Sequence, residues 1–491
     1  MSTQTTAVAA NTTTAPVQGA AEADGAAEAG APVENARPHD VVRAFAANPA
    51  FRAATAEELT NEHNPYRRPV RPDDLPWLNF GKPLPAHKVL RLSGLLGHRI
   101  LRNCYDVEEP FLPDRQNRAA EQDAAHFYDP RSRADAALSA PILERHLFDM
   151  LEGEREPLAA TDIARLRRHI VARAEELTAE PGRAFDVALR TRDRHNAATF
   201  LLVQLSAMLP AAATALGRHA AADYDRAHPE ARAWLAAQHR AWTGRGAAYA
   251  ALFEQAGLTA APVAYWQFFL STSLGRANHL IFLSRYPERY AEFLGAAAYR
   301  LLDEAATAAR FSEVLSTALG IEPIYFDQLI APPTSEDAAN LVSDVLVPLV
   351  ARDGETAVAA FHAGFEDARW LARLWDADLA AQLDWGDQIG LYQEKAEKID
   401  AKLKHDEIEV DLDTFVETEE ETSTTHVHNE HRLVIIEEGQ MHFWNNVGVR
   451  IALNKGDKLL IPTSRLHGSV VLSGSCTYHQ PIIPDELFAQ F

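Results

Sequence analysis

The spacing of apolar residues changes near residue 408, and this change divides the chain into two kinds of structure. Over residues 141–385, apolar side chains recur every three or four positions, as at Leu166, Ile170 and Ala174. That spacing is the period of an amphipathic α-helix. From Ile408 onward, apolar and polar residues alternate in short runs separated by turn residues, which is the period of β-strands. The sequence therefore predicts a multi-domain α + β protein, with an α-helical bundle followed by a small C-terminal β-barrel.

The length and local composition indicate where the domains begin and end. A chain of 491 residues is too long for one hydrophobic core and indicates about three domains. Its first 40 residues contain few large apolar side chains, so they cannot offset the entropy cost of ordering. We therefore predict, in chain order, a disordered tail (1–40), an N-terminal helical arm (41–140), a helical domain (141–385), a linker helix (386–407) and a β domain (408–491).

A proline-punctuated segment, Asn64–Pro72, lies within the N-terminal arm. A segment of this kind has no evident core of its own and typically wraps over a partner surface, either its own domain or a second subunit. We therefore predict a homodimer that is built chiefly by the arm and the helical domain.

Charge and cysteine content argue against several classes of protein. The chain carries 47 basic and 69 acidic residues, a formal net charge of −22, and no long run of Lys or Arg, so we expect it to bind neither nucleic acid nor an anionic membrane. Its two cysteines show no CxxC spacing and no signal peptide is evident, which predicts a cytoplasmic protein. Residues 197–217 carry no charge, but Gln204, Ser206 and Pro210 interrupt them, which favours a buried core helix over a membrane span.

Three histidines in the alternating region have the spacing of a metal site. His426 and His428 are two positions apart on an expected strand, so both imidazoles point to the same side, about 7 Å apart by strand rise. Gly456 marks a later hairpin turn, and Pro462 precedes His467 by five residues. Imidazole nitrogens are common ligands of divalent first-row metals. The sequence therefore predicts that His426, His428 and His467 bind one divalent metal.

These residues resemble the two sequence motifs of the cupin family, although the glutamate that usually follows the second histidine is replaced by Arg432. Three histidines without a carboxylate still form a facial set, as in three-histidine iron dioxygenases, and leave about three coordination positions open. The resemblance implies one Fe(2+) per chain, with the three histidines as both metal ligands and catalytic residues. It also suggests three candidates for the layer of residues around these ligands: Tyr478, Arg450 and Arg432.

An alternative is a degenerate cupin whose histidines only fill the barrel or form a surface patch. Three histidines at all three motif positions argue against this alternative. His431, His442 and His479 lie nearby but off the motif, so we expect them on strand surfaces or the pocket wall.

The helical region carries features that resemble the heme-oxygenase-like diiron oxidase fold. They are Ser271-Thr-Ser273, Asn278-His279, the segment Arg285–Tyr290, Leu294-Gly295 and Tyr325-Phe326. With the arm and the three-histidine cupin, they resemble the N-nitrosourea-forming enzymes over residues 41–491. What this resemblance implies is a diiron domain that N-hydroxylates an N-methylarginine guanidine, and a cupin that rearranges the product with iron(II) and oxygen to form an N–N bond.

The diiron ligands of that family are not matched where we align them. Met208 and Tyr249 stand at two ligand positions, and the stretch 327–336, with Leu329 and Pro333, contains no histidine. A two-iron site needs roughly six ligands on facing helices, so we expect the helical domain to be a metal-free scaffold. We expect His279 to be a packed core residue, and the remaining acidic candidates to be solvated helix charges: Glu230, Glu304, Glu313 and Asp337.

Together these patterns predict a mononuclear non-heme iron(II) cupin enzyme of natural-product biosynthesis. The resemblance implies an N-hydroxylated arginine derivative and O2 as substrates, and an N–N-bonded product, either an N-nitrosourea or a graminine-like diazeniumdiolate. Two alternatives stay open. One is a cupin dioxygenase that acts on another small chelating metabolite, and the other is a non-catalytic metal- or ligand-sensing dimer.

Overall fold

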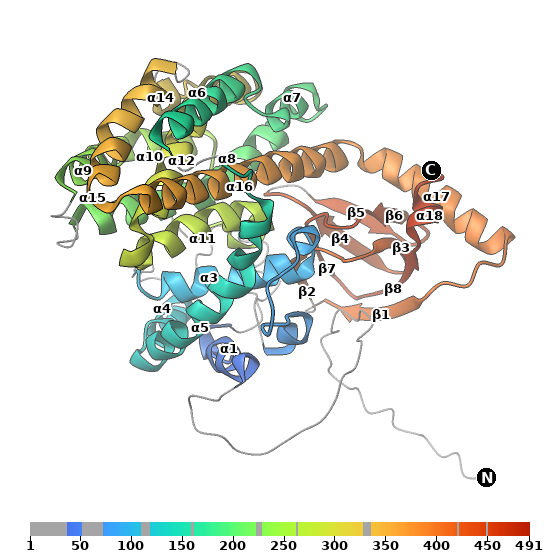
Figure 1. The fold of residues 1–491 in the computed structure, drawn as a ribbon. Coiled ribbons are helices and arrows are strands. Elements are labelled where there is room, and N and C mark those ends of the chain that lie inside the picture. The colour runs from blue at the N-terminus through green and yellow to red at the C-terminus, as the bar shows by residue number, and fades with distance from the viewer. Residues whose placement is uncertain are drawn as a thin grey trace, which may run out of the picture.

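The chain changes from helices to strands between residues 405 and 412, as the change in period predicts (Figure 1). The computed structural model describes residues 37–51, 72–109, 118–158, 162–221, 228–261, 264–327, 335–419, 422–447 and 450–491. The predicted tail lies outside these ranges except for residues 37–40, where α1 begins. Of the proline-punctuated arm, only Pro72 lies inside them.

The helical part runs from residue 38 to residue 405. Its α-helices are α1 (Pro38–Ala46), α3 (Leu92–Asp106), α4 (Arg118–Phe127), α5 (Pro130–Phe148), α6 (Ile163–Ala179), α7 (Arg183–Arg190), α8 (Arg194–Ala221), α9 (Pro229–Gly244), α10 (Gly246–Gln255), α11 (Ser271–Arg285), α12 (Tyr290–Leu319), α13 (Ile324–Asp327), α14 (Ser335–Leu341), α15 (Val347–Asp353), α16 (Glu355–Asp387) and α17 (Ile389–His405). Short 3₁₀ turns join several of them, among them η7 (Trp266–Phe268).

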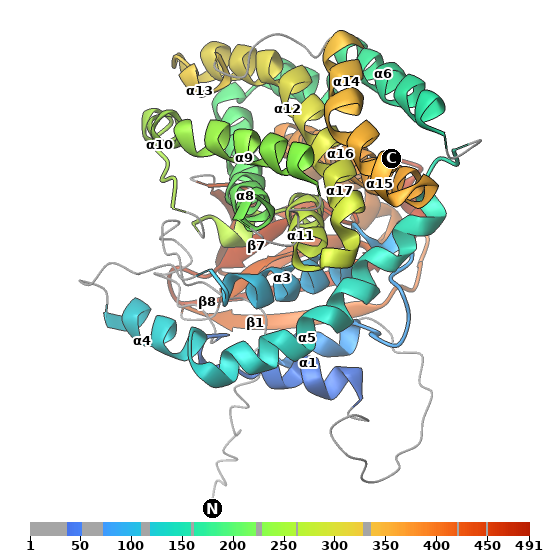
Figure 2. The ribbon, with the colours of Figure 1, turned by 60° about the vertical axis from the view of Figure 1, so that its left-hand side comes forward.

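One hydrophobic core unites the N-terminal helices with the rest of the helical part. It extends from Val42 in α1 to Leu383 in α16 and also includes four residues of the β domain: Val427, Trp444, Leu466 and Val470. Helix α5 runs through position 140, where the composition suggested a boundary, and packs against α1 and α3. Helix α3 in turn packs against α11, below which it lies in Figure 2. The described residues of the arm therefore share their core with the helical domain.

Two glycines let the longest described helices, α12 and α16, cross at close range. A Cβ atom built on Gly295 of α12 would lie 1.9 Å from the Phe361 carbonyl oxygen, and one built on Gly364 of α16 would lie 1.9 Å from the Glu292 carbonyl oxygen. Neither distance is compatible with a side chain, because packed protein atoms do not approach so closely. The absence of a Cβ on each helix therefore sets the spacing between them.

Helix α8 is the uncharged stretch that the sequence assigns to the core. It is long and apolar enough to cross a membrane, with a mean hydropathy of 1.7 in its most apolar window. However, 67% of that window is buried inside the protein, and α8 packs against α9 and α11. These contacts agree with a core helix.

The strands form two four-stranded antiparallel sheets among the described residues, with orders β1-β8-β3-β6 and β2-β7-β4-β5. Their bounds are β1 (Leu412–Thr418), β2 (Thr422–His426), β3 (His431–Glu438), β4 (Gln440–Trp444), β5 (Ile451–Asn454), β6 (Lys458–Ile461), β7 (His467–Val470) and β8 (Ser475–Ile483). Val434 and Leu459 of the first sheet share a core with Met441 and Leu453 of the second, so the sheets pack face to face. No strand pairing joins them within the described ranges, so the expected barrel is a double-sheet sandwich, an arrangement that cupins share.

Helix α17 attaches the β domain to the helical part. Its residues Ala396 and Ile399 pack with Leu433 and Leu460, on the outer face of the first sheet (Figure 1). Trp385, near the end of α16, enters the core between the two sheets. The short helix α18 (Asp485–Phe488) comes after the last strand, β8.

Candidate metal centre

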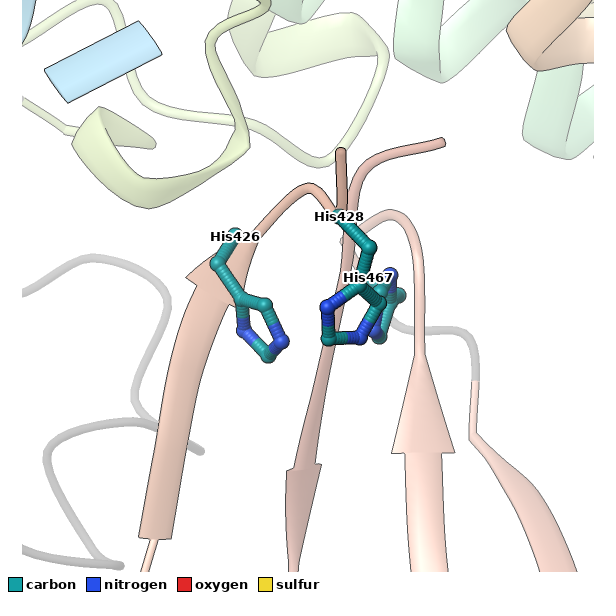
Figure 3. Close-up of side chains that lie close together, drawn as sticks. All are labelled: His426, His428 and His467. Atoms are coloured by element: carbon teal, nitrogen blue, oxygen red, sulfur yellow. The ribbon is translucent and has the colours of Figure 1, made fainter. Parts of the chain in front are cut away.

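His426, His428 and His467 meet where β2 and β7 lie side by side (Figure 3). His426 ends β2, His467 begins β7, and the two are direct partners in the antiparallel pairing. The ring centroids lie 4.8 Å apart for His426 and His428, 4.5 Å for His426 and His467, and 4.9 Å for His428 and His467. One nitrogen of each ring lies within 4.8 Å of the others. The structure thus brings together the three histidines that the sequence selects.

Each of the three rings keeps at least one nitrogen free to bind a metal. The Nδ1 atom of His426 lies 2.9 Å from the Thr424 carbonyl oxygen, and Nδ1 of His467 lies 2.8 Å from that of Arg465. Because a carbonyl oxygen only accepts, each Nδ1 carries the proton and each Nε2 keeps its lone pair. Both ring nitrogens of His428 are buried without a hydrogen-bond partner among the described residues. Such orphaned polar atoms are costly to bury unless a ligand binds them.

Burial keeps the three imidazoles in the neutral form that binds metals. Desolvation, with the positive charge of Arg99 and Arg432, lowers the pKa of His426 to about 4. Desolvation and the neighbouring histidines hold the pKa of His428 and of His467 well below the ordinary range.

Three neutral imidazole nitrogens within 4.8 Å of one another fit a transition metal such as iron. This facial set leaves about three positions open on an octahedral ion. Open positions are typical of catalytic rather than structural metal sites. The donor set therefore suits a metal that must also bind a substrate.

Arg432, which replaces the usual cupin carboxylate, is buried beside the histidines. It is 2% exposed and donates a hydrogen bond of 2.8 Å to Asp413 Oδ2 and one of 3.5 Å to the Gln480 carbonyl oxygen. Its positive charge contributes to the lowered pKa values of His426 and His428. Asp413 and Glu430, whose Oε2 lies 3.7 Å from Nη2, balance the charge of this guanidinium.

Two aromatic rings that were not predicted at this site pack against His467. The ring of Phe443 stacks on it at a centroid distance of 5.1 Å, and that of Trp385 lies 6.5 Å away in an edge contact. The alternation of β4 places Phe443 on the same inward face as Met441, so its position was readable from the sequence. Trp385 comes from α16, and no local pattern connects it with the β domain.

The other two residues that the sequence proposes around the ligands make contacts of their own. The Tyr478 hydroxyl donates to Glu417 Oε1 at 2.7 Å, and its ring stacks on Phe415. Arg450 is exposed, and its charge adds to desolvation in lowering the pKa of His442.

The off-motif histidines His431 and His479 also have partners on the strand surface. The ring of His431 stacks on Phe488 of α18 at 3.6 Å. His479 pairs through Nδ1 with the Thr414 hydroxyl at 2.8 Å, and its Nε2 lies 3.3 Å from Glu437.

The helical domain contains a second group of ligand-type side chains. His169 of α6 and His362 and Glu366 of α16 bring one nitrogen or oxygen atom each within 4.8 Å of one another. His169 Nε2 lies 2.7 Å from Glu366 Oε1, and His362 Nε2 is buried without a hydrogen-bond partner among the described residues. This group was not predicted, because the family alignment pointed instead to positions 208, 249 and 327–336. The spacing of His362 and Glu366, four residues apart on one helix face, was the available signal.

Two arginines already engage the carboxylates around this second group. Arg369 donates to both oxygens of Glu366, with Nη2 2.8 Å from Oε2, and Arg155 binds both oxygens of Asp367 at 2.7 and 2.9 Å. Burial alone would raise the pKa of Glu366, but hydrogen bonds from His169 and Arg369 lower it to about 2. A two-iron centre needs roughly six available ligands. The groups described here, with two fixed guanidinium ions among them, do not fit such a centre.

The remaining helical residues that the sequence analysis weighed lie in varied settings. Met208 is half-buried against the core, the ring of Tyr249 packs on Phe253, and Glu230 is exposed. His279 is buried as expected, with Nε2 3.7 Å from Asp367 Oδ2. Leu329, Pro333 and the side chain of Asp337 lie outside the described residues.

Glu304 is not the solvated helix charge that the sequence predicts. It is largely buried and pairs with Arg245 and Arg300, because α12 turns this position toward α9 and α13. Glu313 pairs with Arg310 on the same helix and is half exposed.

Comparison with known proteins extends the resemblance over most of the chain. No protein-family model matches. The nitrosourea synthase of Streptomyces achromogenes subsp. streptozoticus is 26% identical over 453 residues, which cover 89% of this chain and 94% of that enzyme. At 89% of this chain, the match must include parts of both the helical part and the β domain. This chain resembles the nitrosourea synthase along nearly its whole length, as its motifs predict.

Proposed function

We propose that this chain is a mononuclear non-heme iron(II) enzyme that forms an N–N bond in natural-product biosynthesis. The observation that carries the proposal is the convergence of three neutral imidazoles, each with a free nitrogen, at one buried point. The near full-length similarity to a nitrosourea synthase supports the type of product. The substrate class that follows is an N-hydroxylated guanidine of the arginine type, with O2 as the oxidant.

His426, His428 and His467 would hold the metal. When bound, iron(II) would supply Lewis acidity and adjacent open positions for the substrate oxygen and O2. The carbonyl groups of Thr424 and Arg465 hold two of the rings in the correct tautomer.

We propose further that the helical domain holds no iron and performs no oxidation. The support is that Arg369 binds Glu366 and Arg155 binds Asp367. These two guanidinium groups already give the carboxylates the positive charge that metal ions would bring. The N-hydroxylation of the guanidine must then come from a separate oxygenase that acts earlier. This division of labour would distinguish the chain from a bifunctional enzyme.

The test is anaerobic loading of the protein with iron(II), addition of N-hydroxyarginine or its N-methyl derivative, and then oxygen. We expect oxygen uptake and a mass-spectrometric product that contains an N–N bond. Unmodified arginine should not react. Turnover of unmodified arginine, or Mössbauer detection of more than one iron per chain, would contradict the metal-free helical domain.

The two alternatives give different results in the same experiment. A cupin dioxygenase for another chelating metabolite would bind iron but leave the hydroxyguanidine unchanged. A sensor would bind metal without oxygen uptake for any of the candidate substrates.

A further inference from the structure

The helical domain makes hydrogen bonds to β2 at the residue directly before His426. Arg99 of α3, 2% exposed, donates to the Thr425 carbonyl oxygen at 2.7 Å and to the Thr425 hydroxyl at 3.1 Å. The Thr425 hydroxyl in turn donates to the Gln267 carbonyl oxygen in η7. Thr425 directly precedes His426, so the position of the Thr425 backbone determines where the His426 side chain starts.

A second contact holds the segment after His428. Arg91 Nη1 donates to the Asn429 carbonyl oxygen at 2.6 Å, and the backbone N–H of Leu92 donates to the Asn429 side-chain oxygen at 3.2 Å. Asn429 follows His428 directly and lies between β2 and β3, outside any strand. The start of α3 therefore supplies hydrogen bonds that no neighbouring strand provides there.

The third contact holds the residue before His467. Gln382 of α16, 3% exposed, donates to the Leu466 carbonyl oxygen at 2.9 Å and accepts from the Leu466 N–H at 3.0 Å. One turn earlier on the same helix, the Asp378 carbonyl oxygen accepts from Arg465 at 3.4 Å. Arg465 is also the residue whose carbonyl orients the His467 ring.

Strand pairing within the β domain provides few hydrogen bonds to the residues beside the three ligands. Strand β2 is an edge strand of its sheet, and its pairing with β7 is irregular between Ser423 and His426. An edge strand has a partner on one side only, so its other backbone groups need hydrogen bonds from elsewhere. The helical domain provides them on the residues that adjoin all three ligands.

We infer that Arg91, Arg99 and Gln382 are positioning residues for the metal centre, and that the helical domain serves as its outer support. The inference rests on the metal site of the proposed function but not on its substrate. Each contact reaches a ligand through the adjacent residue of the chain. Loss of such outer contacts typically weakens metal binding about 10- to 100-fold.

The experiment uses the full-length protein and cobalt(II) as the probe, with affinity measured by chelator competition and ligand geometry by the d–d absorption spectrum. Gln382→Leu removes both hydrogen bonds without changing charge, and Arg91→Met removes the contact to Asn429 from a half-buried position. We expect each variant to bind cobalt about 10-fold or more weakly, with an altered spectrum. Circular dichroism of the metal-free forms would establish that the variants fold.

Asn48→Leu is the matched control. Asn48 is half-buried between α1 and η2 (Pro49–Phe51) and makes the same kind of double backbone contact: its Nδ2 donates to the His126 carbonyl oxygen at 3.1 Å, and its Oδ1 accepts from the Ala50 N–H at 2.8 Å. Its Nδ2 also donates to the Ser132 hydroxyl at 3.0 Å. None of these partners adjoins a ligand or contacts a residue that does, so the variant should lose comparable stability but keep its cobalt affinity and spectrum.

Unchanged affinity in the folded variants, or an equal loss in the Asn48→Leu control, would overturn the inference. If Gln382→Leu does not fold, Arg91→Met decides the question alone. A wild-type chain that binds no cobalt would overturn the metal site itself, which separates failure of the proposed function from failure of this inference.

Discussion

The two strand histidines of the metal centre are oriented by the same local device. In each case Nδ1 donates to the carbonyl oxygen two residues earlier, Thr424 for His426 and Arg465 for His467. For His467 the accepting residue lies before β7 begins, in a segment that α16 contacts. His428 has no such bond among the described residues and is the ligand with both nitrogens unpartnered.

At the residue scale, His467→Ala should empty the metal centre. A facial site that loses one of three nitrogen ligands keeps too little affinity to retain iron through purification. We expect iron content to fall from about one per chain to below about 0.1, measured by inductively coupled plasma mass spectrometry. His479→Ala, which removes a histidine that pairs with Thr414 instead, is the control and should retain its iron. Full iron content in His467→Ala would exclude the three-histidine site.

Glu366 gives a prediction for pH. Its pKa is lowered to about 2 in the folded protein, because hydrogen bonds from His169 and Arg369 outweigh the effect of burial. A carboxylate with a lowered pKa stabilises the fold above its unfolded pKa, and this contribution is lost as the pH falls toward 2. Relative to Glu366→Gln, we expect the wild type to be more stable by up to about 3 kcal/mol at pH 6, and by less at pH 3. Urea denaturation at both pH values measures this difference, and a gap that widens toward pH 3 would refute it.

At the scale of elements, the crossing of α12 and α16 depends on the two glycines that face each other's backbone. A methyl group on Gly364 would overlap the Glu292 carbonyl, so Gly364→Ala must push the helices apart. We expect a loss of about 3 kcal/mol or more in the free energy of unfolding, measured by thermal or urea denaturation. Gly244→Ala, at the end of α9 with no atom near the added methyl, should change stability by less than about 1 kcal/mol. Equal stability of the two variants would mean that the crossing adjusts without cost.

At the scale of the whole molecule, we propose that the chain forms a homodimer. The proposal rests on the proline-punctuated segment Asn64–Pro72, which has no evident core of its own. Size-exclusion chromatography with light scattering should give about 108 kDa, twice the 54.1 kDa of one chain. A mass near 54.1 kDa at micromolar concentration would contradict the dimer. Deletion of residues 52–71 should shift the mass toward the monomer if the segment wraps over the partner.

The sequence by itself determined the fold class and selected the three histidines that the structure brings together. Both depend on short-range periods: His426 and His428 share a strand face because side chains alternate, and His467 follows a turn and a proline at a fixed interval. The resemblance to nitrosourea-forming enzymes likewise came from local motifs, and the similarity over 89% of the chain bears it out.

Only the tertiary structure decided which distant residues meet. Glu366 finds His169 across 197 positions of the chain, and Gln382 of α16 finds Leu466 across 84. Those encounters depend on how close the helices approach and in what register, which in turn depends on packing at positions such as Gly295 and Gly364. No local period encodes that geometry. The group formed by His169, His362 and Glu366, and the contacts of the helical domain beside the three histidines, therefore became visible only in three dimensions.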